Sequence, residues 1–139
     1  MNIIVIGHGM VGHKFLECLA ESGAGDLKVT ILCEEPRPAY DRVHLSEFFA
    51  GKSAEDLSLV APGFFDAGRS PVQFDLKLNA KARHIDLERK QVVVNVAGAE
   101  ETLSYDKLVL ATGSYPFVPT VAGNQRKDCF VYRLSLIHI

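Results

Sequence analysis

The sequence has no tryptophan, few cysteines and no excess of charge of either sign. Its three cysteines are too widely spaced to form the paired motifs of a zinc site or a redox disulfide. Fifteen lysines and arginines stand against seventeen aspartates and glutamates, so no basic surface predicts binding to nucleic acid. No apolar run reaches the length of a membrane span. We therefore expect no metal, no nucleic acid and no membrane among the ligands of this chain.

What remains has the composition of an ordinary globular protein. Hydrophobic residues make up 47% of the 139 residues and charged residues 23%, which fits one domain or part of a larger one. The amino terminus leads into an apolar run almost at once, so we expect no signal peptide. Cys18 and Cys33 are then interpreted as small core residues of a protein kept in the reducing cytoplasm.

The first 34 residues have the pattern of a dinucleotide-binding βαβ unit. Ile3–Ile6 is an apolar run that leads into Gly7–Gly12, which reads Gly-His-Gly-Met-Val-Gly and matches G-x-G-x-x-G. Apolar residues then recur at helical spacing up to Gly23. A second apolar run, Val29–Cys33, ends on Glu34. Strand, turn, helix, strand and acid thus occur in the order that this unit requires.

Each key position of this unit has a mechanical explanation. Gly7 permits a sharp turn out of the strand, Gly9 leaves room for a pyrophosphate, and Gly12 lets the helix pack closely. The first turn of the helix offers free N–H groups and a positive dipole end to the phosphates. Glu34 lies where a carboxylate binds ribose hydroxyls and disfavours a 2′-phosphate. The alternative is a glycine-rich turn in an α/β domain that binds no nucleotide.

The segment after Glu34 is predicted to be a loop, because two prolines interrupt residues 35–42. It leaves the carboxyl end of a parallel strand, the edge where ligands of open α/β sheets bind. Arg37 and Arg42 are thus candidates to lie near an anionic cofactor, with Tyr40 covering one face of it. The alternative is a solvated, proline-stiffened loop. A short helix is expected from His44 to Gly51, and a second is expected to begin at a Ser53 capping box.

Beyond residue 71 the hydrophobic pattern changes from helical to alternating. Strands are expected at 72–78, 82–85, 91–96 and 102–104, and we interpret them as a small antiparallel meander covering the parallel sheet. Residues 107–111 are continuously apolar after a lysine, the pattern of a strand buried on both faces. The predicted fold is therefore α/β, an incomplete Rossmann-like βαβ domain with a small antiparallel β-meander.

The five histidines do not have the spacing of a metal site. His8 and His13 are five positions apart, with the first in the turn, so they do not share a helix face. His8 is expected to lie at the top of the phosphate loop instead.

Three segments together resemble the FAD-dependent pyridine-nucleotide oxidoreductases. They are the βαβ unit, the segment 34–46 with its Tyr-Asp-Arg-x-x-Leu-Ser motif, and the segment 105–116 with its Ala-Thr-Gly strand end. The middle segment is most similar to the large subunits of NAD(P)H nitrite reductases. The resemblance covers residues 1–133, the amino-terminal part of a FAD/NAD(P)-binding domain. Residues 134–139 do not follow the family pattern, and we expect them to be an artefact.

The resemblance implies a set of cofactor-binding residues and no catalytic residue. The glycine motif would hold the FAD pyrophosphate, the acid would bind the adenosine ribose, and the arginine with a nearby serine would approach the flavin or the pyrophosphate. One meander residue would meet the adenine through its backbone, and the Ala-Thr-Gly strand end would pass close to the cofactor. These residues are Gly7, Gly9, Met10, Gly12, Glu34, Arg42, Ser46, Ala82, Thr112 and Gly113.

The resemblance also implies an oxidoreductase that passes a hydride from NAD(P)H to the flavin N5 in nitrate assimilation. The NAD(P)H motif, the iron–sulfur cluster and the siroheme would belong to regions beyond this chain, so the 139-residue piece itself is expected to be inactive. A small subunit or a second copy would be the partner of the full-length enzyme. The alternatives are a non-enzymatic NAD-sensing Rossmann domain and another flavoprotein reductase, such as a ferredoxin or rubredoxin reductase.

Overall fold

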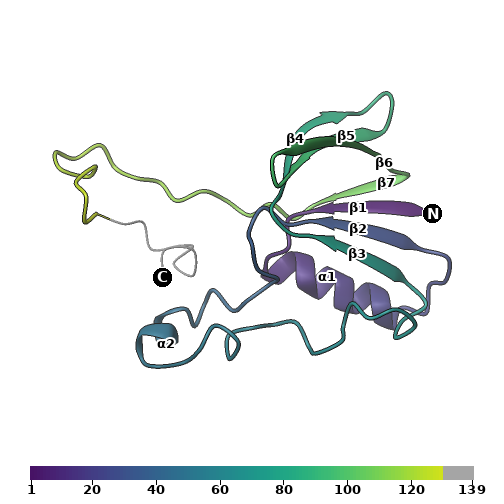
Figure 1. Ribbon diagram of the computed structural model, residues 1–139, viewed down its shortest axis with the longest axis horizontal. Coiled ribbons are helices and arrows are strands. Elements are labelled where there is room, and N and C mark those ends of the chain that lie inside the picture. The colour runs from purple at the N-terminus through teal and green to yellow at the C-terminus, as the bar shows by residue number, and fades with distance from the viewer. Residues whose placement is uncertain (130–139) are drawn as a thin grey trace.

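The computed structural model describes residues 1–129, which form two sheets and one long helix (Figure 1). The elements in chain order are β1 (Asn2–Ile6), α1 (Met10–Glu21), β2 (Lys28–Leu32), α2 (Ser46–Phe49), β3 (Gln73–Lys77), β4 (Ala80–Asp86), β5 (Gln91–Val96), β6 (Ala99–Ser104) and β7 (Lys107–Leu110). The meander β4–β6 covers one face of the larger sheet and α1 covers the other (Figure 1). Neither helix in this part of the chain is long and apolar enough to cross a bilayer.

The larger sheet is parallel throughout, in the order β3-β2-β1-β7. At its centre, Val5 of β1 pairs with Ile31 of β2 on one side and with Val109 of β7 on the other. The meander is antiparallel, in the order β4-β5-β6. The predicted α/β fold, with a parallel sheet and a separate antiparallel meander, is confirmed.

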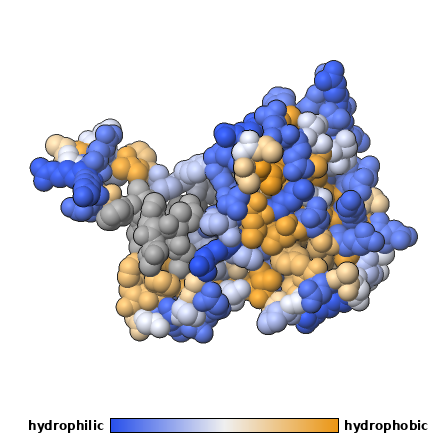
Figure 2. Space-filling view, in the orientation of Figure 1, coloured by the Kyte–Doolittle hydropathy of each residue, from blue (hydrophilic) through white to orange (hydrophobic). Residues whose placement is uncertain are grey.

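Strand β1 is apolar on both faces because it serves two cores. Val5 packs in the cluster that contains Leu16 of α1, whereas Ile4 packs in the cluster that contains Val92 and Val94 of β5. Successive side chains of a strand point to opposite faces, so neither face of β1 can be polar. Figure 2 shows apolar surface gathered between the meander and α1, while the outer tips of the meander are mainly hydrophilic.

The strand near Val72 lies in a different sheet from the one that we predicted. β3 runs parallel to β2, with Leu76 opposite Ile31, so it belongs to the main sheet and not to the meander. Its Phe74 and Leu76 pack against the core on the α1 side. The alternating pattern identified a strand with one buried face, but it carries no information on which strand lies beside it.

The long connection between β2 and β3, residues 33–72, is called the crossover segment below. Its helix α2 begins at Ser46 and ends at Phe49, so it is shorter than predicted, and Leu45 rather than Ser46 occupies the N-cap position. At Ser53 the predicted capping box forms, because the Ser53 N–H donates to the Asp56 carboxylate and the Asp56 N–H donates to the Ser53 hydroxyl oxygen. Only one turn follows there, not a helix. Polar local bonds, rather than regular structure, shape this segment.

The prediction for the two cysteines is half right. Cys33 is buried, but Cys18 is exposed on α1. Val11, Lys14 and Cys18 lie on one face of the helix, and all three are exposed. This is the outward face of α1, so Val11 is not part of the core.

Candidate functional site

Two of the three motif glycines are required by packing within the chain. Gly7 has a φ of 103°, and a Cβ atom there would clash with the carbonyl oxygen of Ala111 at the end of β7. A Cβ atom at Gly12 would clash with the carbonyl oxygen of Gly7. These contacts draw the β1 end, the β7 end and the start of α1 together. The backbone of Thr112 adjoins Gly7 in the same place.

Gly9 is different, because nothing in the fold itself demands a glycine there. A Cβ atom at Gly9 would meet only the guanidinium of Arg42, at 3.8 Å from its Nη2, which is an ordinary contact. Gly9 is the N-cap of α1, and in the described chain no side chain caps the helix and its first turn holds no acid. The open backbone at Gly9 and the positive end of α1 therefore offer a place for an anion beneath Arg42.

Arg42 belongs to a cluster with Glu35 and Tyr40, called the arginine cluster below. Arg42 Nη2 donates to Glu35 Oε1, and its guanidinium carbon lies 5.4 Å from the centre of the Tyr40 ring. The Tyr40 hydroxyl donates to Glu35 Oε2 at 2.9 Å. Burial, followed by this bond to Glu35, raises the pKa of Tyr40 to about 12. Arg42 Nε is buried and has no partner among residues 1–129, which leaves a donor available at the site.

The acid beside Arg42 is Glu35, whereas Glu34 points elsewhere. Glu34 Oε1 accepts a bond from Lys81 Nζ of β4, and its side chain is 53% exposed. The Glu35 side chain is only 14% exposed. Both acids lie beyond the end of β2, where the chain bends, and they have different partners: Lys81 of β4 for Glu34, and Arg42 with Tyr40 for Glu35. Sequence reasoning missed Glu35, because the pattern of the strand ends before these two residues.

The remaining predicted site residues lie at varied distances from the glycine turn. Met10 begins α1 and is 37% exposed, and Gly113 follows Thr112 with a φ of 68°. Ala82 lies in β4, partly buried against the core of the meander. Ser46 is exposed at the start of α2, which lies away from the sheet (Figure 1). The structure thus brings together Gly7, Gly9, Gly12, Arg42 and Thr112, while Glu34, Ser46 and Ala82 have their contacts elsewhere.

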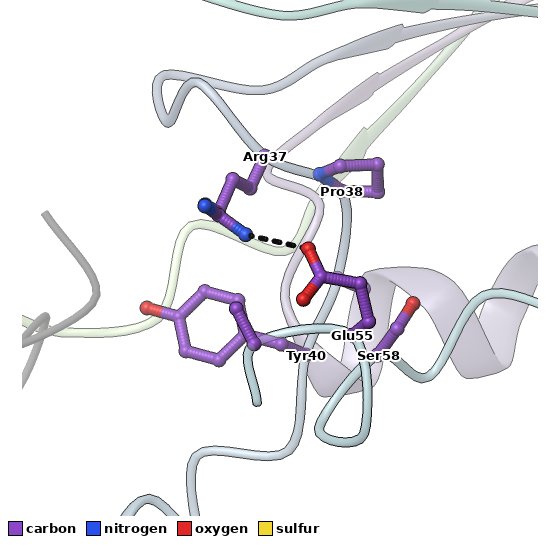
Figure 3. A pocket seen from close by; sticks show the side chains of 7 residues that line it. Arg37, Pro38, Tyr40, Glu55 and Ser58 are labelled. Carbon is purple, nitrogen blue, oxygen red and sulfur yellow. Dashed lines mark ion pairs between the residues drawn. The ribbon is translucent and has the colours of Figure 1, made fainter. Parts of the chain in front are cut away.

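Arg37, the other arginine predicted near an anionic cofactor, faces a different hollow. Its Nη1 lies 3.6 Å from Glu55 Oε1, and both side chains are well exposed. Figure 3 shows this ion pair across a cavity of about 140 Å³, beside the ring of Tyr40 and the hydroxyl of Ser58. Arg37 therefore joins two parts of the crossover segment and has no described contact with the glycine turn.

His8 does not top the glycine turn, because its side chain is directed into the protein. His8 is 4% exposed and His13 is 3% exposed, and their rings meet edge to face with centroids 5.4 Å apart. Phe65 packs on His8 and Phe64 on His13. Burial, and secondarily the neighbouring His13, lowers the pKa of His8 to about 4. His8 is therefore neutral at physiological pH.

Known proteins share this fold and much of this sequence. The chain is 45% identical over 134 residues to the nitrite reductase (NADH) large subunit of Escherichia coli K12, covering 96% of this chain and 15% of that protein. It is 48% identical over 132 residues to the nitrite reductase [NAD(P)H] large subunit of Klebsiella oxytoca, covering 94% of this chain and 13% of that protein. The chain thus spans only a small part of the length of these relatives.

A solved structure shares the fold of this chain. A NAD-dependent persulfide reductase from A. fulgidus superposes with a TM-score of 0.77 at 27% identity, over 90% of this chain and 24% of that one. The family model described as pyridine nucleotide-disulphide oxidoreductase matches residues 1–135. The chain belongs to the pyridine nucleotide-disulphide oxidoreductase family.

Proposed function

We propose that this chain is the FAD-binding part of an NAD(P)H-dependent flavoprotein oxidoreductase of the nitrite reductase type. The observation that carries the proposal is the open backbone at Gly9 beneath the Arg42 guanidinium. Gly7 and Gly12 are explained by packing, but Gly9 and the unpartnered Nε of Arg42 are not. A diphosphate would supply negative charge to the positive end of α1 at Gly9 and an acceptor oxygen to the Nε–H of Arg42.

The residues around Gly9 fit the parts of FAD. Backbone N–H groups of the first turn of α1, at Met10 and beyond, would hold the diphosphate, with Arg42 above it and Gly12 keeping the helix close. Thr112 and Gly113 at the end of β7 would border the cofactor on the far side of the turn. Ala82 would meet the adenine through its backbone. When bound, FAD supplies the redox chemistry by accepting a hydride from a reduced nicotinamide.

Two acids compete for the ribose. Glu34 has the spacing from the glycine motif, but it is exposed and pairs with Lys81. Glu35 has the better position, because it is largely buried and already contacts the arginine above Gly9. A diphosphate would share the guanidinium with Glu35, whose carboxylate could then accept bonds from hydroxyl groups as well. We propose a role for either acid and distinguish them by experiment below.

The identity of the full enzyme is inferred from its relatives. Identities of 45% and 48% to nitrite reductase large subunits favour nitrite as the substrate of the longer protein, with nitrate assimilation as its context. The iron–sulfur cluster, the siroheme, any partner subunit and a cytoplasmic location are part of the same proposal. A second candidate, a flavoprotein reductase with another acceptor, is favoured by the close superposition on a persulfide reductase. An NAD-sensing domain is disfavoured, because it would continue with regular βα repeats where this chain has the crossover segment and the meander.

A titration of the 139-residue chain with FAD tests the proposal. We expect FAD fluorescence to be quenched on binding and Arg42→Gln to weaken binding at least tenfold, the scale of one charge-assisted bond. Glu35→Gln and Glu34→Gln form a matched pair, and the larger loss identifies the ribose acid. NAD⁺ serves as the competing ligand. A chain that ignores FAD, or that binds NAD⁺ more tightly than FAD, would contradict the proposal.

A further inference from the structure

The buried histidines are not used by the proposed cofactor site, yet they lie directly behind it. His8 separates the two glycines that form the turn, and His13 lies in the second turn of α1. Both rings are almost fully buried against phenylalanines. Burying a polar ring costs free energy unless it makes hydrogen bonds, so the partners of these rings indicate what they do.

Each histidine bonds the backbone of the crossover segment. The N–H of Ala39 donates to His8 Nδ1 at 3.2 Å, and His13 Nε2 donates to the carbonyl oxygen of Leu59 at 3.0 Å. Ala39 and Leu59 are bonded to each other, because the N–H of Leu59 donates to the carbonyl oxygen of Ala39 at 3.0 Å. The two rings therefore hold both sides of one short antiparallel pairing. We call this arrangement of His8, His13, Ala39 and Leu59 the histidine clamp.

The partners of the rings show where a proton must lie. Since His8 Nδ1 accepts a bond, the proton of its neutral ring must be on Nε2; since His13 Nε2 donates to a carbonyl, that nitrogen carries a proton. The two remaining nitrogens, His8 Nε2 and His13 Nδ1, are buried and have no partner among residues 1–129. The two rings meet edge to face. The charged group facing the pair is Glu17, with its Oε1 3.8 Å from His13 Nε2.

The clamp is linked to Arg42 by a short stretch of backbone. Tyr40 follows Ala39 directly, and its ring lies beneath the Arg42 guanidinium. The N–H of Asp41 donates to the carbonyl oxygen of Leu57 at 2.8 Å, which continues the pairing toward Arg42. The position of the guanidinium above Gly9 therefore depends on where Ala39 is held, and His8 connects Ala39 to the glycine turn itself.

We propose that His8 and His13 are positioning residues, buried rings whose hydrogen bonds hold the Ala39–Arg42 stretch so that the Arg42 guanidinium stays over Gly9. The anion that Arg42 receives there rests on the proposed function. The clamp itself is a property of this chain's own residues. Through it, the affinity of the anion site at Gly9 depends on the buried hydrogen bonds of His8 and His13.

A double-mutant cycle measured by FAD titration tests the coupling. In His8→Leu the acceptor is lost, and we expect FAD to bind about tenfold more weakly; His8→Asn places an oxygen near the Nδ1 position and should stay within about threefold. In an Arg42→Gln background, His8→Leu should have almost no further effect. Equal losses in the two backgrounds would overturn the proposal, since His8 would then act without Arg42.

A measurement on the chain without ligand separates this proposal from FAD binding. Nitrogen NMR at pH 7 should find the His8 ring neutral with its proton on Nε2, and a proton on Nε2 of His13. Amide exchange at Ala39, and the Nε–H signal of Arg42, should both become faster or broader in His8→Leu and recover in His8→Asn, while Val5 is unchanged. If the chain ignores FAD but these shifts occur, only the cofactor assignment fails. If Ala39 and Arg42 are unaffected, the clamp is wrong whatever the chain binds.

Discussion

The sheet with its covering layers and the crossover segment are built in different ways. The sheet is stabilised by apolar burial on both faces, with Val5, Leu16 and Val92 fully buried. The crossover segment has one small cluster of its own, Tyr40, Leu45 and Leu57. Its later part packs Phe64, Phe65 and Val72 against the core on the α1 side. Its earlier part is ordered largely by local polar bonds such as those of Asp41 and Asp56. The comparison shows that the rigid part supplies the backbone of the candidate site, while the less packed part supplies its charge.

The largest expected effect separates Gly7, which the packing of the sheet requires, from Gly9, which we expect to serve cofactor binding. Gly7→Ala should destabilise the protein by roughly 2–5 kcal/mol, because φ is left-handed and the new Cβ would meet the β7 end. Gly9→Ala should leave the denaturant midpoint nearly unchanged but weaken FAD binding. Urea unfolding and FAD titration of both variants measure the two effects. Gly25→Ala is the control, because a Cβ atom at Gly25 would have no neighbour within 4 Å. Equal destabilisation by the first two would contradict the division.

Lowering the pH should reduce the stability of the protein through His8 of the histidine clamp. The pKa of His8 is lowered from 6.5 to about 4 in the folded protein. Between these two pH values His8 is protonated in the unfolded chain but neutral in the folded chain. Stability should therefore fall as pH drops from about 6.5 to about 4, by up to roughly 3 kcal/mol from this one residue.

Urea midpoints of the wild type and His8→Asn across that pH range check the expectation. The difference in urea midpoint between the wild type and His8→Asn should become smaller as the pH falls. A gap that is independent of pH would mean that His8 titrates normally.

We expect the crossover segment to unfold locally while the sheet stays folded. Leu45 is 1% exposed in its small cluster, and Leu45→Ala should cost about 2 kcal/mol, at the low end for a buried leucine. Because that cluster lies outside the two cores of the sheet, amide exchange should rise at Asp41 and Leu59, whose N–H groups bond across the crossover segment, while Val5 and Val92 stay protected. Uniform acceleration at all four amides would show that the two regions unfold as one unit.

The smallest effect is expected at the exposed Glu34–Lys81 pair. Lys81→Met removes a surface ion pair between the end of β2 and the meander, and such pairs contribute little to stability. We expect no measurable change in the urea midpoint at physiological salt. A clear loss would indicate that this pair fixes the meander on the sheet.

Sequence reasoning succeeded where local pattern and burial coincide. The run Ile3–Ile6, the glycine motif and the helix after it were predicted correctly, because each is determined by neighbours in sequence. The sheet partner of β3 was wrong, because strand neighbours are set by contacts between distant segments. The inward turn of His8 was missed for the same reason, since its partner Ala39 is 31 positions away. The difference between Glu34 and Glu35 was missed as well, because both lie in the bend after β2 and their partners Lys81 and Arg42 belong to other segments.

Strand β7 lies at one end of the strand order in the described chain, and its Leu110 is 63% exposed. An outer strand presents a row of backbone donors and acceptors that another chain can pair with. We therefore expect concentrated preparations of this polypeptide to associate through that edge. A lysine at position 110 would oppose such association, because edge lysines are a common natural defence against it.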